Sequence, residues 1–256
     1  MSFSIITTVL NGERFISDCI ESVQNQKYFE DVEHIIIDGG SEDNTASLIK
    51  EYSRKYKNIN YRLEKNIGIY KGINIGLNIA QNKIIGILNS DDFYNDDQVF
   101  KNIDNEFQKN QEIFALHSNV KILRRDNINK IYRVYSSKEL FPQDFLNCYH
   151  PPHTSLFIKR SIYKKFGDFN ENLKIASDFE FMLRVFGKNK VKSKFLNKTF
   201  VCMRSHGTST KNLKNIIFSN IEVVKSFKLN NLKISYFSLV LKIFRKVFQI
   251  RLWLLL

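Results

Sequence analysis

The sequence predicts an α/β fold in which a mostly parallel sheet carries helices on both faces and a helical tail follows. Three observations predict it. Strand-like runs alternate with segments of helical spacing over residues 3–107, which is typical of parallel strands joined by crossovers. The strand-like runs are mainly aliphatic, as in strands buried on both faces. With 256 residues, 43% of them hydrophobic, the chain can bury a core without disulfides.

The first half of the chain contains four predicted strands, at residues 3–9, 32–37, 59–63 and 84–88. Asn11-Gly12 ends the first strand, and the glycines of Asp38-Gly39-Gly40 allow a tight turn after the second. Apolar residues at helical spacing predict intervening helices near residues 15–23, 43–56 and 71–80.

The pattern is less regular in the second half. Strands are expected at residues 113–120, 131–135, 154–158 and 195–203, and a helix at residues 177–186. The strand at 154–158 follows two prolines. The cysteines Cys19, Cys148 and Cys202 have no metal-ligand spacing, so we expect reduced thiols. The first four residues lack the features of a signal peptide, which favours a cytoplasmic protein.

The fourth strand stops abruptly in Asn89-Ser90-Asp91-Asp92. Ligands of open α/β sheets bind beyond the carboxyl ends of the strands, and adjacent carboxylates repel each other unless a cation lies beside them. Mg²⁺ or Mn²⁺ would suit these oxygen ligands together with a substrate phosphate. Alternatively, Asp91 or Asp92 caps a helix over residues 96–107. This stretch alone leaves both explanations open.

The formal net charge of +13 is concentrated in the tail, where residues 211–256 contain nine Lys or Arg and one acid. Apolar residues recur there every three or four positions from Ile234 to Phe248, but no apolar run is long enough to span a bilayer. We therefore divide the chain into a main domain, 1–210, and a basic amphipathic tail, 211–256. The tail is expected to lie on a membrane surface; packing on the domain or a homo-oligomer contact are the alternatives.

Several polar segments occur in a defined order: Ile5 to Gly12, Ile36-Ile37-Asp38-Gly39-Gly40-Ser41, Gly68-Ile69-Tyr70, Leu88-Asn89-Ser90-Asp91-Asp92, Ser177-Asp178-Phe179-Glu180 and Arg204-Ser205-His206-Gly207. In this order they resemble the motifs of the family 2 inverting glycosyltransferases, over about four-fifths of the chain. The resemblance implies the GT-A fold, which has a Rossmann-like sheet. It also implies metal-dependent hexosyl transfer from a nucleotide sugar, with a UDP-sugar as the expected donor, to a hydroxyl group.

The resemblance also implies roles for individual residues. Asp178 is expected to be the catalytic base, with Glu180 as competitor and an N-cap role as the alternative. Asp92 is expected to bind Mn²⁺ or Mg²⁺, and His206 to complete the metal's shell or contact the diphosphate. His153 and Arg184 are expected near the acceptor, the diphosphate or a catalytic carboxylate. Donor contacts are expected from Thr8, Asn11, Glu13, Asp38, Lys65, Asn66, Gly68, Lys71, Asn89, Ser90 and Asp91.

Three of the donor contacts carry a qualification. Asp38 could instead bind backbone amides of its own turn, and Lys65 could be a solvated surface lysine. Lys71 stands where many relatives have an acid, so a phosphate contact is expected there.

The expected function is transfer to a lipid-linked saccharide acceptor in surface polysaccharide synthesis (O-antigen, capsule or similar), at the inner face of the cell membrane. One alternative is a sugar-phosphate nucleotidyltransferase, but residues 10–13 match its glycine-rich loop poorly. The other is a basic nucleic-acid-binding protein. Because the excess charge lies in the tail beside apolar residues, no nucleic-acid partner is expected.

Overall fold

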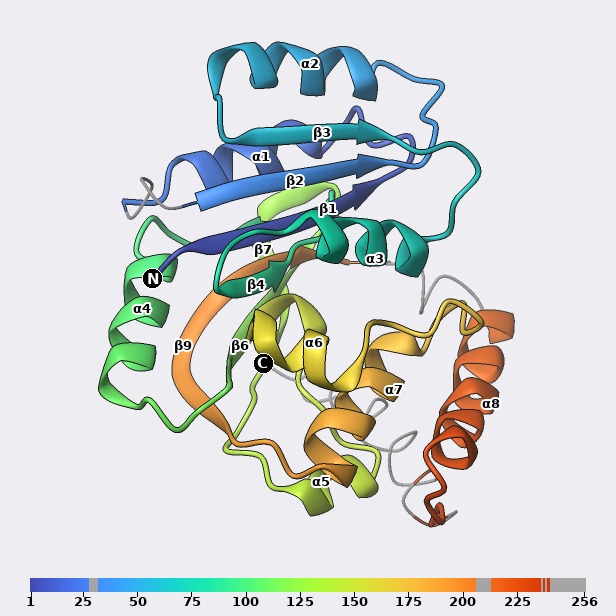
Figure 1. Ribbon diagram of the computed structural model, residues 1–256. Helices are drawn as coiled ribbons and strands as arrows, with labels where there is room; N and C mark the ends of the chain where they lie inside the picture. Colours follow the sequence, from blue (N-terminus) through green and yellow to red (C-terminus); the bar gives the residue numbers. More distant parts are fainter. Residues whose placement is uncertain (28–31, 206–212, 236, 238, 240–256) are drawn as a thin grey trace.

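The structure is a computed structural model that describes residues 1–27, 32–205, 213–235, 237 and 239 (Figure 1). Its sheet has the order β3-β2-β1-β4-β8-β6-β9-β5, with β7 paired to β6. The strands are β1 Phe3–Val9, β2 Val32–Asp38, β3 Ile59–Leu63, β4 Ile84–Ile87, β5 Phe93–Tyr94, β6 Ala115–Arg124, β7 Asn127–Tyr135, β8 Phe157–Lys159 and β9 Ser193–Arg204.

Strands β1 to β4 form the parallel half of the sheet, with β1 between β2 and β4. Successive side chains point to opposite faces, so Ile6 joins one core and Ile5 the other. One face is covered by α3 Ile69–Ile79, α6 Arg160–Phe166 and α7 Ser177–Met182; the other is covered by α1 Ile16–Gln24, α2 Thr45–Lys55 and α4 Val99–Lys109. The predicted α/β architecture with helices on both faces is confirmed.

The second half of the sheet is mixed. Strand β8 pairs antiparallel with both β4 and β6, and thereby joins the two halves. Strands β6 and β9 are parallel to each other, whereas β5 and β7 pair antiparallel with β9 and β6. The strand predicted at 154–158 is wrong in its first part, because a 3₁₀ turn, η1 His153–Ser155, precedes β8. The helix predicted at 177–186 divides into α7 and a π-helical segment, η2 Leu183–Lys188.

The last described helix, α8 Leu213–Leu229, lies at the edge of the molecule beside α7 (Figure 1). Its Val223 and Phe227 are fully buried in the core that contains α7. The first part of the predicted tail is thus packed on the main domain. In the described part of the chain, no helix combines the length and hydropathy needed to cross a bilayer. All three cysteines are buried thiols.

Candidate functional site

The adjacent acids Asp91 and Asp92 lie beyond the carboxyl end of β4, where the chain turns into β5. Helix α4 begins at Val99 after an N-cap residue, Gln98, so neither acid caps it. The helix-cap alternative for these acids is therefore wrong, because β5 lies between them and the helix.

The two neighbouring carboxylates have different environments. Asp91 is partly exposed and its Oδ2 lies 2.9 Å from Nη1 of Arg125. Asp92 is buried, and it accepts hydrogen bonds from the Asn89 side-chain amide at 2.8 Å and from the Arg204 backbone N–H at 3.1 Å. Both of these donors are neutral. Burial, and next the charge of Asp91, raise the pKa of Asp92 to about 7.

These residues fit a divalent cation. A buried carboxylate whose hydrogen-bond donors are neutral is stabilised in its charged form by a cation beside it. Within the described residues, no group of three or more His, Cys, Asp and Glu side chains could hold a metal. One or two carboxylates together with substrate phosphates suffice for Mg²⁺. The second expected ligand, His206, lies outside the described residues.

Asp178 faces the same region from α7. Its Oδ1 accepts hydrogen bonds from the Phe179 N–H at 2.8 Å and the Tyr70 hydroxyl at 3.3 Å, and its Oδ2 lies 3.3 Å from His153 Nδ1. Burial raises the pKa of Asp178, but the hydrogen bond and charge of His153, with the charge of His150, lower it to about 2. Because Ala176 is the N-cap of α7, the N-cap alternative for Asp178 is wrong.

His153 lies between the two acidic groups. While Nδ1 faces Asp178, Nε2 lies 3.4 Å from Oδ1 of Asn89, which in turn donates to Asp92. Burial lowers the pKa of His153, but Asp178 and then Asp92 outweigh this effect and raise it. The structure thus connects Asp92 and Asp178 through two side chains, from η1 and from the end of β4.

Glu180 and Arg184 do not join this group. Arg184 donates from Nε and Nη2 to the two oxygens of Glu180 at 3.0 Å, and its Nη atoms also bind three backbone carbonyls between Phe166 and Asp168. Asn230, the residue directly after α8, donates to Glu180 Oε1 at 2.9 Å. Glu180 is buried, so this pair fastens α7 to its neighbours.

Three of the expected donor residues have their side chains engaged within the protein. Asn11 and Glu13 accept backbone N–H groups from Glu42 and Asn44, both at 2.9 Å, and so tie together the loops after β1 and β2. Asp38 is fully buried; its Oδ1 accepts the N–H groups of Gly40 and Ser41, and its Oδ2 accepts the Tyr61 hydroxyl at 3.1 Å. The turn role weighed for Asp38 is therefore observed.

The remaining donor candidates lie at the carboxyl ends of the parallel strands. Thr8, Asn89 and Ser90 are half-buried at the ends of β1 and β4. The segment between β3 and the first turn of α3 presents the exposed residues Lys65, Asn66, Gly68 and Lys71. The Asn66 N–H donates to the Gly39 carbonyl at 3.1 Å, which holds this segment beside the turn after β2.

Sequence reasoning missed two arginines. The guanidinium groups of Arg125 and Arg204 both lie 4.6 Å from the ring centre of Phe15. Arg204 is buried, donates to the Asp91 carbonyl at 2.6 Å and pairs with Asp18. Arg204 belongs to a motif noted in the sequence, although no role was predicted for it. Arg125 directly follows β6 and belongs to no motif that could have indicated a role.

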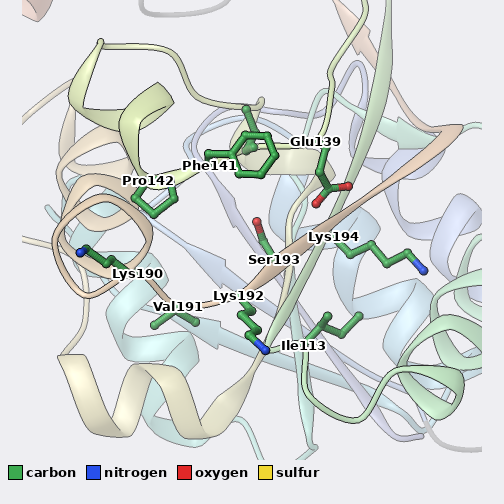
Figure 2. Close-up of a pocket in the computed structure, with 10 residues that line it drawn as sticks. Ile113, Glu139, Phe141, Pro142, Lys190, Val191, Lys192, Ser193 and Lys194 are labelled. Carbon is green, nitrogen blue, oxygen red and sulfur yellow. The ribbon is translucent and has the colours of Figure 1, made fainter.

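A separate hollow lies elsewhere in the molecule (Figure 2). It has a volume of about 400 Å³ and is lined by Phe141 and Pro142, with Lys192 and Ser193 near the start of β9. Its Ile113 precedes β6, whereas Arg125, which contacts Asp91, follows that ten-residue strand. At about 3.3 Å per residue, the hollow lies roughly one strand length from the acids and does not belong to their site.

The fold is that of the GT-A glycosyltransferases. The structure superimposes on S. aureus TarS residues 1–349 in complex with UDP-GlcNAc with a TM-score of 0.67 and 18% identity, covering 88% of this chain and 67% of TarS 1–349. A mannosyltransferase from Pyrobaculum calidifontis in complex with GDP-Man and Mn²⁺ gives a TM-score of 0.63 at 14% identity, over 89% of this chain and 67% of that one. At these identities the likeness shows the fold alone.

The family follows from the sequence comparison. The model described as Glycosyl transferase family 2 matches residues 4–167, so the chain belongs to this family. An uncharacterized glycosyltransferase of Haemophilus influenzae is 28% identical over 240 residues, which cover 90% of this chain and 72% of that protein. The nucleotidyltransferase and nucleic-acid-binding alternatives are therefore set aside.

Other relatives are much longer than this chain. The minor teichoic acid biosynthesis protein GgaB of Bacillus subtilis is 29% identical over 198 residues, covering 73% of this chain and 21% of GgaB. The chondroitin synthase of Escherichia coli is 28% identical over 186 residues, covering 71% of this chain and 26% of the synthase. The chain thus spans about a quarter or less of these two relatives.

Proposed function

We propose that this chain transfers a hexosyl group, with inversion, from a UDP-linked sugar to a hydroxyl of a lipid-linked or oligosaccharide acceptor during surface polysaccharide synthesis. The observation that carries the proposal is the connection of Asp92 to Asp178 through Asn89 and His153. The names of GgaB and chondroitin synthase, and the UDP-GlcNAc complex of TarS, support the polymer and donor classes.

Asp178 is the proposed base. The acceptor hydroxyl would take the position of His153 beside Asp178 Oδ2, and the carboxylate would accept its proton as the oxygen attacks the anomeric carbon. Losing the His153 contact removes the main influence that lowers the pKa of Asp178, so the carboxylate becomes a stronger base. A positioned base of this kind contributes about 10²–10⁴ in rate.

The leaving diphosphate needs positive charge. Asp92, with His206 as a proposed further ligand, would hold Mn²⁺ or Mg²⁺, which when bound would neutralise charge on the diphosphate. Asp91, already paired with Arg125, would contact the ribose or a water of the metal shell.

The donor would lie along the carboxyl ends of β1, β2 and β4. Thr8, Asn89 and Ser90 would line the centre of this groove, and the exposed segment with Lys65, Asn66, Gly68 and Lys71 its outer side. Lys71 would contact phosphate. Asn11 and Glu13 would shape the groove through the loops that they join. Asp38 would bind the uracil or the ribose of the donor only if the nucleotide displaces the Tyr61 hydroxyl from its Oδ2.

We further propose that the enzyme works at the cytoplasmic face of the membrane, where the basic segment 211–256 associates with the surface. Anionic lipid attracts each nearby Lys or Arg by about 1 kcal/mol. A homo-oligomer through this segment is the competing proposal.

The test is UDP release from a panel of UDP-sugars with Mn²⁺, measured for the wild type and for Asp178→Asn. One donor should support turnover, and Asp178→Asn should lower the turnover rate about 10²–10⁴-fold while the dissociation constant for UDP stays nearly unchanged. Glu180→Gln is the matched control: it breaks the pair with Arg184, so stability should fall more than the turnover of the folded enzyme. Turnover at the wild-type rate in Asp178→Asn would refute the assignment of the base.

A further inference from the structure

Helix α8 has an exposed face that is both apolar and basic. Ile217 is 61% exposed, Phe218 42% and Ile221 58%, and the exposed lysines Lys214, Lys225 and Lys228 lie along the same helix. We call these six residues the outer face of α8. Three large apolar side chains exposed within five residues form a patch rather than scattered surface residues, and such patches mark interaction sites.

The opposite face of α8 is fixed to the domain. Val223 and Phe227 are fully buried, and the Phe227 ring packs beside that of Phe179 in α7. Glu222 is buried as well; its two oxygens accept the backbone N–H groups of residues 174–176 at 2.7–2.8 Å. Glu222 is the single acid in the sequence of α8. Because it points inward, the charges on the outer face are all positive.

We propose that the outer face of α8 binds the surface of an anionic lipid bilayer. The apolar side chains would enter the interface and the lysines would contact lipid phosphates, as in amphipathic helices that lie on membranes. Uniform positive charge favours lipid over a protein partner, because protein interfaces deplete lysine. The sequence that follows continues the same chemistry: residues 240–256 contain four Lys or Arg and no acid.

This surface lies close to the proposed base. Glu222 holds residues 174–176, and Asp178 follows two residues later. The Tyr70 hydroxyl, which donates to Asp178, also donates to the Ile175 carbonyl at 2.7 Å. Figure 1 shows α8 at the edge of the molecule with α7 directly inside it. A bilayer on the outer face would therefore lie one helix away from Asp178, which suits an acceptor that stays anchored in lipid; this consequence rests on the proposed function.

The test is sedimentation of the full chain with vesicles of phosphatidylcholine alone or with phosphatidylglycerol added. In the outer-face variant, Ile217, Phe218 and Ile221 are each replaced by Gln. Its matched control replaces three apolar residues of β7 with similar exposure, Ile128, Ile131 and Tyr132, by Gln. The outer-face variant should lose binding about tenfold or more, and the control less than about twofold. Equal binding by the outer-face variant and the wild type would overturn the proposal.

The charge is tested separately. Replacing Lys214, Lys225 and Lys228 by Gln should remove the preference for phosphatidylglycerol and leave the weaker binding to neutral vesicles unchanged. A preference that persists would contradict the proposal. The proposal would also be overturned if the wild type were a dimer in solution and the outer-face variant a monomer. The outer face of α8 would then bind a second copy of this chain.

UDP release from a donor in solution separates this inference from the proposed function. It should be unchanged in both α8 variants, because none of the substituted residues belongs to the catalytic group. Vesicle binding without UDP release from any donor would uphold the surface and refute the enzyme assignment. If UDP is released but the α8 variants bind vesicles as well as the wild type does, the enzyme assignment is upheld and the proposed membrane surface is refuted.

Discussion

At the scale of single residues, the adjacent acids Asp91 and Asp92 have different environments and therefore different expected roles. Asp91 meets the positive charge of Arg125, whereas Asp92 is buried and receives hydrogen bonds from neutral groups. The pKa of Asp92 consequently rises to about 7, well above the ordinary value of 3.8. A carboxylate that is costly to ionise without a cation is well suited to bind one.

This cost predicts the effect of Asp92→Asn on stability. The folded protein retains a proton on Asp92 that the unfolded chain loses near pH 4, so the free energy of unfolding falls as pH rises from about 4 through 7. At pH 8 without metal, Asp92→Asn should therefore raise the melting temperature by several degrees, since each pKa unit corresponds to about 1.4 kcal/mol.

Mn²⁺ should raise the melting temperature of the wild type and leave that of Asp92→Asn unchanged, both measured by calorimetry. The reason is that a ligand that binds only the folded state stabilises that state. Glu112→Gln is the control, since its exposed pair with Lys192 lies away from these acids and contributes little. A wild type that gains nothing from Mn²⁺ would contradict the assignment of Asp92 as a metal ligand.

His153 should be visible in the pH dependence of catalysis. Its contact lowers the pKa of Asp178 to about 2, and kcat/KM reports the pKa values of the free enzyme. In His153→Asn the pKa of Asp178 should rise, so the acidic limb of the kcat/KM profile should move to higher pH. Tyr70→Phe, which loses only a 3.3 Å hydrogen bond to Asp178, should move it less. An unmoved acidic limb in His153→Asn would show that His153 does not act on the base.

At the scale of elements, the sequence predicted best those strands that are buried on both faces. Strands β1, β2 and β4 are mainly aliphatic and buried, and their bounds agree with the prediction to within a residue. Strand β5 has two residues and helix α5 Pro142–Leu146 has five. Such short elements lack the periodicity from which they could be recognised.

The candidate site could be predicted only in part from the sequence. Asp91 and Asp92 could be found because they end a buried strand, and Asp178 through the family resemblance. The contact between His153 and Asp178 could not, because it exists only once β8 has joined the two halves of the sheet. For Asp38, the sequence left two roles open, and only the observed hydrogen bonds show that its own turn and Tyr61 use both oxygens.

Helix α3 offers a test of how closely the elements must pack. A Cβ atom at Gly76 would lie 2.5 Å from Cγ2 of the buried Ile6 in β1, so α3 would have to move away from the sheet. Gly76→Ala should lower the free energy of unfolding by about 1–3 kcal/mol, measured by urea denaturation. Gly68→Ala, at the start of the same helix with no atom within 4 Å of the added Cβ, should cost less. Equal effects of the two variants would contradict this packing.

At the scale of the whole molecule, the described part of the basic segment packs on the main domain. The basic segment begins at residue 211, yet α8 contributes Val223 and Phe227 to the main core and Glu222 to the segment before Asp178. The exposed lysines of α8 are therefore attached directly to the part of the fold that carries the proposed base, Asp178. A surface that attracts these lysines would therefore also orient the proposed catalytic group.

The central claim is that Asp92 and Asp178 act on one nucleotide sugar. A crystal structure of the chain with UDP and Mn²⁺, with the ion located by its anomalous signal, tests it most directly. The account predicts Mn²⁺ at Asp92, the diphosphate bound to it, and the uridine along the ends of β1 and β2, with Asp178 facing the open side of the diphosphate. Mn²⁺ or UDP bound away from Asp92 would contradict it.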